Sequence, residues 1–371
     1  MIPVFKPSFG EEELEALREP FRTGWIGLGP KTREFEQRFA EYIGTRFAIA
    51  VNSGTAALHL ALKVVEIKEM EVITTPLTFI STNHVILYNS AIPVFADIEP
   101  DTLNINFKEI QKNITAKTKA ILVVHYGGHA CDMDPILEIA KEKNLWVVED
   151  AAHGSGGEYK GRKLGSLGNL GCFSFHAVKN MSTGEGGMIT TDDPELYGRL
   201  LKLRWMGISK DTWSREEKDE KYSWYYNVEE VGFKCHMNDI PAAIGLVQLK
   251  KLEKMNLRRK EITERYNKGL ENLKWLETPV IRPYARSSHH NYVIKVEERD
   301  QLNIYLQEKG ISTGVHYIPS NHYDMYRPFR GETPVSDTVW KKLLTLPLFP
   351  DLKDEEVDYI IREIKEFGRR R

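Results

Sequence analysis

The sequence predicts an α/β protein with two domains. The first is a three-layer α/β/α domain whose middle layer is a mostly parallel mixed sheet, and the second is a small α+β domain. From about residue 50 to 205, short apolar segments rich in β-forming residues alternate with amphipathic segments, as in a sheet covered by helices. A lysine- and glutamate-rich stretch that begins near residue 250 marks the junction with the second domain. A chain of 371 residues, 41% of them hydrophobic, can bury more than one core. We therefore expect a large domain at 1–250 and a small one at 251–371.

Six short apolar segments of the first domain, each followed by polar residues or glycine, are the predicted strands of its sheet. They are residues 72–75, 93–96, 120–125, 145–149, 172–175 and 188–190. Buried strands of this kind are largely parallel. Helices are expected at 55–65 and 135–143, where apolar residues recur every three or four positions and would pack on the sheet.

The second half of the chain has a different pattern. Residues 206–230 are polar yet rich in aromatics and lack periodicity, which predicts a long functional loop. A helix is expected at 241–252, and its lysine- and glutamate-rich continuation to about 276 is expected to be an exposed helix at the domain junction. In the C-terminal domain we expect strands at 291–295 and 315–318 and helices at 300–309 and 355–367.

Composition excludes several classes of function. Lys and Arg total 51 against 53 Asp and Glu, and the net charge of -2 offers no general attraction to nucleic acid or an anionic membrane. No segment approaches the roughly 20 apolar residues of a membrane span, and the N-terminus lacks a signal-peptide pattern. Cys131, Cys172 and Cys235 are far apart, without a CxxC spacing, which fits a reduced, cytoplasmic protein.

No metal site is predicted. His125 and His129 are four residues apart, but Gly127 and Gly128 lie between them and indicate a loop. The helical spacing that zinc ligands use is therefore not met.

Lys179 is the most informative residue for chemistry. It follows the predicted strand at 172–175 and precedes a glycine-rich turn containing Gly184, Gly186 and Gly187, where side chains can converge on a ligand. Position alone does not separate it from an ordinary solvated lysine, so its neighbours must decide.

Asp150 ends another predicted strand, and ligands bind at the carboxyl ends of strands in open α/β sheets. A carboxylate there can pair with a protonated pyridine nitrogen and keep the ring electron-withdrawing. It can equally be a helix N-cap. His153, three residues later, can be a ligand contact or a packed or capping histidine.

Two earlier segments offer further ligand contacts. Ser53-Gly54-Thr55 enters a predicted helix, whose free N–H groups and positive dipole end can hold a phosphate, although such a run is usually only a cap. Phe79 can stack on a flat ring, although a phenylalanine is more often part of the core.

These features together resemble the DegT/DnrJ/EryC1/StrS family of pyridoxal-phosphate-dependent sugar aminotransferases, which have the aspartate-aminotransferase-like fold (fold type I). The resemblance covers nearly the whole chain. Its marks are Gly24-Trp25-Ile26-Gly27, Ser53-Gly54-Thr55-Ala56-Ala57-Leu58, Thr78-Phe79, Asp97-Ile98-Glu99-Pro100, Glu149-Asp150-Ala151-Ala152-His153, Ser174-Phe175-His176 with Lys179, Gly184-Glu185-Gly186-Gly187 and Met237-Asn238-Asp239-Ile240.

The resemblance implies a role for each of these positions. Lys179 would bind pyridoxal 5'-phosphate as a Schiff base and act as general acid/base. The residues that would hold the cofactor are Asp150 at the pyridine nitrogen, His153 near the ring, Phe79 on its face, Gly54, Thr55 and Ser174 at the phosphate, and Asn238 at the phosphate of the neighbouring subunit. The substrate-side residues would be Trp25, Ile26, His316 and Tyr317. A homodimer with shared active sites follows from the role of Asn238.

The resemblance also implies a reaction, in which an amino group passes from glutamate to a keto-sugar, most often one carried on a nucleotide. Relatives with histidine at the lysine position are dehydratases, so Lys179 favours transamination. A keto-inositol or a keto-octulosonate remains an alternative acceptor. A non-enzymatic regulator that kept the fold is a more distant alternative; no helix-turn-helix or basic patch favours it. The run after Pro319 departs from relatives, with an extra residue and no second proline, so the substrate subclass stays open.

Overall fold

A computed structural model describes residues 1–209, 226–329 and 331–370. Its centre is a seven-stranded sheet in the order β1-β9-β8-β5-β4-β2-β3. The strands are β1 (Phe47–Val51), β2 (Glu71–Thr74), β3 (Ile92–Phe95), β4 (Thr118–Val124), β5 (Trp146–Asp150), β8 (Leu170–Ser174) and β9 (Gly187–Thr191). Only β9 runs against the others, since it pairs antiparallel with both β1 and β8. The predicted fold class is confirmed.

Helices cover both faces of this sheet because side chains alternate along each strand. On β1, Ile49 and Val51 join a core with helices α3 (Gly54–Val64), α4 (Ser81–Tyr88) and α7 (Pro194–Leu203). Ala48 and Ala50 face the opposite side, where they pack with α2 (Pro30–Ile43) and the first half of α9 (Asp239–Leu270). Helices α5 (Phe107–Asn113) and α6 (Met133–Lys143) form a third core with β2, β3, β4 and β5.

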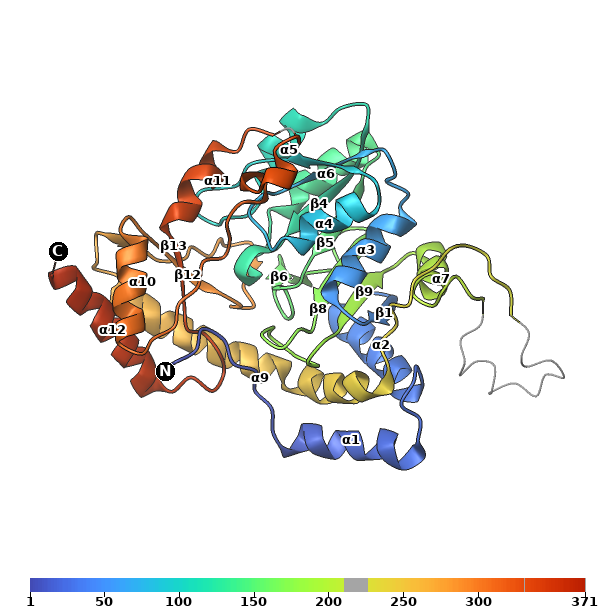
Figure 1. The fold of residues 1–371 in the computed structure, drawn as a ribbon, viewed down its shortest axis with the longest axis horizontal. Coiled ribbons are helices and arrows are strands. Elements are labelled where there is room, and N and C mark those ends of the chain that lie inside the picture. The colour runs from blue at the N-terminus through green and yellow to red at the C-terminus, as the bar shows by residue number, and fades with distance from the viewer. Residues whose placement is uncertain (210–225, 330, 371) are drawn as a thin grey trace.

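The long helix α9 links the two parts of the molecule (Figure 1). Beyond the large sheet, its second half packs on a three-stranded antiparallel sheet and two helices. These elements are β10 (Leu276–Glu277), β12 (Tyr292–Val296), β13 (Leu343–Leu346), α10 (Arg299–Glu308) and α12 (Asp354–Arg369). The N-terminus joins them, since Ile2 pairs with Ile311. The division at residue 250 stays a prediction, and α9 crosses it without interruption.

The described residues form several further elements, of which α1 lies along the outer side of α9 (Figure 1). They are α1 (Glu11–Thr23), α11 (Pro334–Val339), β6 (Glu158–Tyr159), β7 (Arg162–Lys163), β11 (Ala285–Arg286), and the 3-10 turns η1 (Tyr126–Gly128), η2 (Ser320–His322), η3 (Asp324–Tyr326) and η4 (Trp340–Lys342). Within the described ranges, no helix combines the length and the apolar character needed to cross a lipid bilayer.

Most predicted elements agree with the structure within a few residues, and two predictions are wrong. The six predicted strands match β2, β3, β4, β5, β8 and β9 to within two residues. The segment 315–318 is not a strand, because only Gly314 beside it bridges to Thr345. The helix expected to be exposed up to 276 ends at Leu270 and buries Ile262 and Tyr266 in the C-terminal core. Residues 210–225 of the predicted loop lie outside the described residues.

A buried carboxylate joins the sheet to the loop before β8. Glu149 on β5 is fully buried, and its Oε2 accepts hydrogen bonds from His125 Nε2 (2.8 Å) and the backbone N–H of Gly165 (2.9 Å). Its Oε1 accepts from the N–H groups of Leu167 and Gly168, each at 2.7 Å. Burial acts to raise the pKa of Glu149, but the hydrogen bonds from His125 and the backbone outweigh it and lower the pKa below 4.5. The charged carboxylate therefore holds the loop in place.

We expect Glu149→Gln to lower the free energy of unfolding by about 3–5 kcal/mol, because an amide NH₂ would face donors where an oxygen now accepts. Urea unfolding at pH 7 measures this loss. Because the folded-state pKa is lowered, the contribution of Glu149 is present above pH 4.5 and is lost as the pH falls through the folded-state value. Glu138→Gln on the exposed side of α6 is the control, and an equal loss in both variants would contradict the role of Glu149.

Candidate functional site

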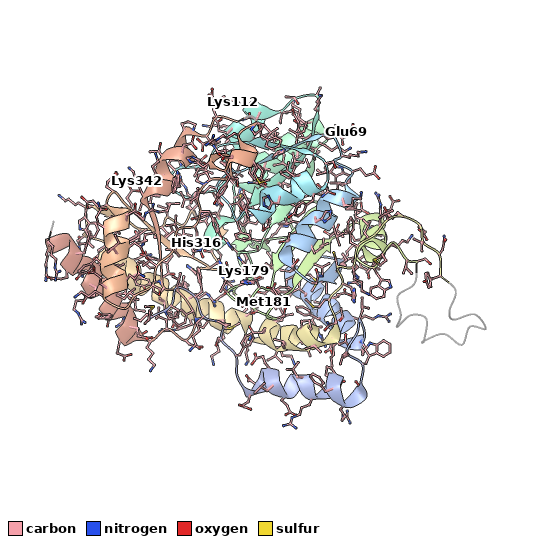
Figure 2. All side chains as sticks on the ribbon, viewed as in Figure 1. Glu69, Lys112, Lys179, Met181, His316 and Lys342 are labelled. Carbon is pink, nitrogen blue, oxygen red and sulfur yellow. The ribbon has the colours of Figure 1, made fainter. Side chains whose placement is uncertain are left out.

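A cavity of about 390 Å³ lies at the carboxyl end of the parallel strands and contains most of the predicted site residues. This is where the loops after β4, β5 and β8 meet the first turn of α3. Its lining residues are Ser53, Gly54, Thr55, Leu58, Thr78, Phe79, Ser81, Val124, Asp150, Ala152, His153, Ser174, His176, Val178, Lys179, Glu185, His316 and Tyr317. Figure 2 shows Lys179 in the interior of the molecule, with His316 beside it.

Lys179 lies in the connection between β8 and β9 and lines this cavity. A turn fixes its backbone, because its N–H donates to the carbonyl of His176 (2.9 Å). Desolvation by the surrounding protein lowers the pKa of the Lys179 amine to about 8, against the opposing effect of the Asp150 charge. A substantial fraction of this amine is therefore neutral near physiological pH, as a nucleophile or base must be.

Asp150 is the last residue of β5 and faces the cavity, whereas the preceding Glu149 faces the other way because strand side chains alternate. Its Oδ2 accepts a hydrogen bond from the Thr82 hydroxyl (2.8 Å), and its Oδ1 accepts one from the N–H of Ala152 (3.1 Å). Burial raises the pKa of Asp150, and these hydrogen bonds oppose that effect. The carboxylate thus keeps acceptor capacity toward the cavity.

The first turn of α3 forms the phosphate-sized end of the cavity. Ser53 caps the helix by accepting from the N–H of Ala56 (3.0 Å), and the N–H groups of Gly54 and Thr55 precede the first helical hydrogen bond. A Cβ on Gly54 would lie 2.7 Å from Cβ of Ser174, so glycine allows the helix to approach the end of β8. Backbone donors, the Ser174 hydroxyl and the positive helix end therefore converge at one point, an arrangement suited to an anion.

Two histidines and two aromatic side chains form the remaining wall. His153 Nδ1 accepts from the N–H of Gly127 (3.3 Å), and its Nε2 lies 3.3 Å from the Tyr317 hydroxyl. Burial lowers the pKa of His153 well below 6.5, so the ring is neutral, carries its proton on Nε2 and donates to Tyr317. Phe79 is 57% exposed and lies 6.1 Å from the Tyr317 ring, and His316 Nδ1 contacts the Thr345 hydroxyl (2.8 Å).

Three predicted site residues do not line this cavity. Trp25 and Ile26 line a separate hollow of about 380 Å³ with Trp205, Lys234 and His236. Asn238 is the N-cap of α9, where its side chain accepts from the N–H of Ile240 (3.1 Å). Their expected roles stay predictions.

Thr78, Ser81, His176 and Glu185 line the cavity but were not predicted as site residues from the sequence. Neither was Thr82, which bonds to Asp150. His176 and Glu185 approach to 3.7 Å at the mouth of the cavity. For the threonines, the available signal was two hydroxyl residues four positions apart that follow a buried strand, although Thr78 itself lies in a bend before α4.

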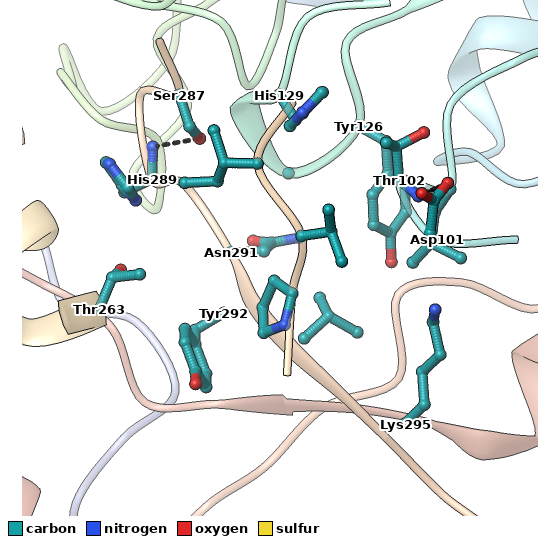
Figure 3. A pocket seen from close by; sticks show the side chains of 16 residues that line it. Asp101, Thr102, Tyr126, His129, Thr263, Ser287, His289, Asn291, Tyr292 and Lys295 are labelled. Atoms are coloured by element: carbon teal, nitrogen blue, oxygen red, sulfur yellow. Dashed lines mark hydrogen bonds between the residues drawn. The ribbon is translucent and has the colours of Figure 1, made fainter. Parts of the chain in front are cut away.

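A second cavity, of about 50 Å³, lies between η1, α9 and β12 (Figure 3). Thr263 and Asn291 line it, and the Thr263 hydroxyl and both amide atoms of Asn291 are buried without a partner among the described residues. A polar cavity of this size suits a few ordered waters. The larger cavity, which is lined by both Lys179 and Asp150, is the candidate active site.

Comparison with known proteins agrees with this geometry. The DegT/DnrJ/EryC1/StrS aminotransferase family matches residues 7–365. The chain is 42% identical to the spore coat polysaccharide biosynthesis protein SpsC of Bacillus subtilis, over 98% of this chain and 96% of that protein. Spr1654 of Streptococcus pneumoniae in its PMP form has a TM-score of 0.94 at 33% identity, with both chains covered completely. Helicobacter pylori PseC, an aminotransferase involved in the biosynthesis of pseudoaminic acid, has a TM-score of 0.92 at 27% identity, again over both complete chains.

The expected enzyme class and cofactor are thereby confirmed, since this family consists of pyridoxal-phosphate-dependent aminotransferases and the Streptococcus protein has been solved in PMP and PLP forms. The match extends over nearly the whole chain and includes the strands and turns that carry the cavity. The chain belongs to the DegT/DnrJ/EryC1/StrS aminotransferase family.

Proposed function

We propose that this enzyme transfers an amino group from glutamate to a keto-sugar carried on a nucleotide. The observation that carries the proposal is the Lys179 amine and the Asp150 carboxylate in one cavity. Two relatives support a sugar acceptor. SpsC is a spore coat polysaccharide biosynthesis protein, and PseC is an aminotransferase involved in the biosynthesis of pseudoaminic acid. A keto-inositol or keto-octulosonate acceptor would use the same residues. A regulator without activity would not need this pair.

The cavity fits pyridoxal phosphate by the chemistry of its donors and acceptors. The first turn of α3 and Ser174 suit the phosphate, and the close approach of Gly54 to Ser174 keeps that position free of a side chain. Asp150 suits a protonated ring nitrogen, and Phe79 and His153 suit the ring and its substituents. When bound, the cofactor supplies an aldehyde for covalent attachment and a ring that withdraws electrons from the reacting carbon.

Lys179 then has two tasks in the proposed reaction. Its Nζ would hold the cofactor covalently, and as a free amine it would be the general base and acid that takes a proton from the donor carbon and gives one back. It would have the same role toward the keto-sugar. The lowered pKa of Lys179 leaves Nζ able to accept the proton near neutral pH.

We also propose a homodimer with shared active sites. Asn238, Trp25 and Ile26 lie outside the Lys179 cavity of their own chain, and we assign Asn238 to the phosphate of the neighbouring subunit and Trp25 and Ile26 to the substrate side. His316 and Tyr317 are assigned to the substrate side of their own cavity. The three cysteines are free thiols, which fits the proposed cytoplasmic location.

The acceptor is identified by loading the protein with pyridoxamine phosphate and offering a panel of nucleotide-linked and free keto-sugars. Mass spectrometry should detect the amino sugar from one nucleotide-linked class, in a single turnover. Lys179→Gln should lower the rate by at least about 10²–10⁴-fold, because it removes the general acid/base. Absence of product from every keto-sugar, with turnover of a keto-acid instead, would contradict a sugar acceptor.

The pH dependence of cofactor attachment tests the lowered pKa of Lys179. Only the neutral amine attacks the aldehyde, so the attachment rate to the apo protein should rise with pH and level off above about 8. An ordinary lysine would continue to gain up to about 10.4. Borohydride trapping followed by peptide mass spectrometry measures modification at Lys179. A rate still rising at pH 10 would show that the amine is not desolvated.

Asp150→Ala should retain the fold and lose transamination by at least about 100-fold, because the ring nitrogen loses the charge that keeps it protonated. Single-turnover kinetics with glutamate measure the loss, and circular dichroism reports the fold. Asp300→Ala is the control, since Asp300 is 78% exposed on α10. Turnover near that of the unchanged protein would refute the role of Asp150.

A further inference from the structure

The Asp150 carboxylate is held by a chain of two threonine hydroxyls. Thr82, in the first turn of α4, places its hydroxyl 2.8 Å from Asp150 Oδ2, and the hydroxyl of Thr78 lies 2.8 Å from that of Thr82. Thr78, Thr82 and Asp150 are each at most 4% exposed. These bonds join two segments that are 68 residues apart in the sequence.

The direction of these two hydrogen bonds follows from the chemistry of the Asp150 carboxylate. An ionised carboxylate can only accept hydrogen bonds, and a hydroxyl has a single hydrogen to donate. Thr82 therefore donates its hydrogen to Asp150, and Thr78 must donate to Thr82. If Asp150 carried a proton, that proton could be donated to Thr82 and both bonds could reverse. With the carboxylate ionised, both bonds point toward Asp150 and each polarises the next.

We propose that Thr82, supported by Thr78, is a positioning residue that keeps the Asp150 carboxylate ionised and oriented for the ring nitrogen of the cofactor. The inference rests on the proposed role of Asp150. Thr82 holds Oδ2 and the N–H of Ala152 holds Oδ1, so the carboxylate cannot rotate without breaking two hydrogen bonds. Each oxygen retains a lone pair for a donor in the cavity.

The balance of effects on Asp150 explains why such support is needed. Burial raises the pKa of this carboxyl group, and the Thr82 hydrogen bond is the first effect that opposes burial, ahead of the Ala152 N–H and the more distant charge of Lys179. A buried carboxylate without donors would take up a proton. It would then have no charge with which to hold a protonated ring nitrogen.

Thr82→Val tests the proposal, because valine keeps the shape of threonine and removes only the hydroxyl. The measurement is the apo protein's dissociation constant for pyridoxal phosphate and for an analogue in which carbon replaces the ring nitrogen. The ratio is the dissociation constant of the analogue divided by that of pyridoxal phosphate, and it reports the contact between the ring nitrogen and Asp150. A general loss of stability changes both constants alike and cancels in the ratio. Loss of one hydrogen bond to a charged group should lower the ratio by about tenfold.

Thr74→Val is the matched control, because Thr74 is also fully buried and its hydroxyl has no partner among the described residues. We expect this variant to keep the ratio, and Thr82→Ser, which restores a hydroxyl, to recover it. Thr78→Val should lower the ratio by a smaller factor, and it serves as the test if Thr82→Val does not fold.

The outcomes separate this inference from the proposed function. An unchanged ratio in Thr82→Val, with a reduced ratio in Asp150→Ala, would overturn the positioning role and leave the role of Asp150 intact. An unchanged ratio in Asp150→Ala would overturn both. A ratio reduced equally in Thr74→Val and Thr82→Val would also overturn the proposal, because loss of any buried hydroxyl would then explain the effect.

Discussion

Burial acts in opposite directions on Lys179 and Asp150, the two buried charged groups of the cavity, and the rest of the site follows from this constraint. Desolvation raises the pKa of the Asp150 carboxyl group and lowers that of the Lys179 amine. Asp150 receives hydrogen bonds from a hydroxyl and a backbone N–H, whereas no hydrogen bond to the Lys179 amine occurs among the described residues. The two hydrogen bonds therefore oppose the effect of burial on the acid, whereas the base is left free to lose its proton.

The architecture of the sheet makes this difference possible. Because alternate residues of a strand face opposite sides, β5 directs Glu149 into a fully bonded network with His125 and directs Asp150 into the cavity. The two adjacent carboxylates thus have separate environments, one in a buried hydrogen-bond network and one at the wall of the cavity. The turn after β8 brings Lys179 to the same edge. Since parallel strands end at one edge, groups from distant parts of the sequence meet there.

Local pattern predicted six of the seven strands of the large sheet and the residues at their ends, and it failed where the environment is set by distant segments. Lys179 and Asp150 were recognisable because each follows an apolar strand. The bond from Thr82 to Asp150 was not, because the sequence does not state which loops will meet. The segment at 315–318 has the composition of a strand, yet its neighbour Gly314 bridges to Thr345 by a single pair. The second half of α9 is rich in lysine and glutamate, but the C-terminal core covers its apolar side.

The N-terminal segment is linked to the wall of the cavity by stacked rings. Phe5 stacks on His290 at 5.4 Å, and His290 stacks on His153 at 4.2 Å. His290 is fixed in turn, because its Nδ1 lies 2.8 Å from Oδ1 of Asn180, one residue after Lys179. Burial lowers the pKa of both histidines well below 6.5, so neither ring is charged and the stack costs no like-charge repulsion. The lysine turn, the wall of the cavity and the first residues of the chain are therefore held by one set of contacts. A disturbance of any one of them would reach the others through neutral, closely packed rings rather than through charge.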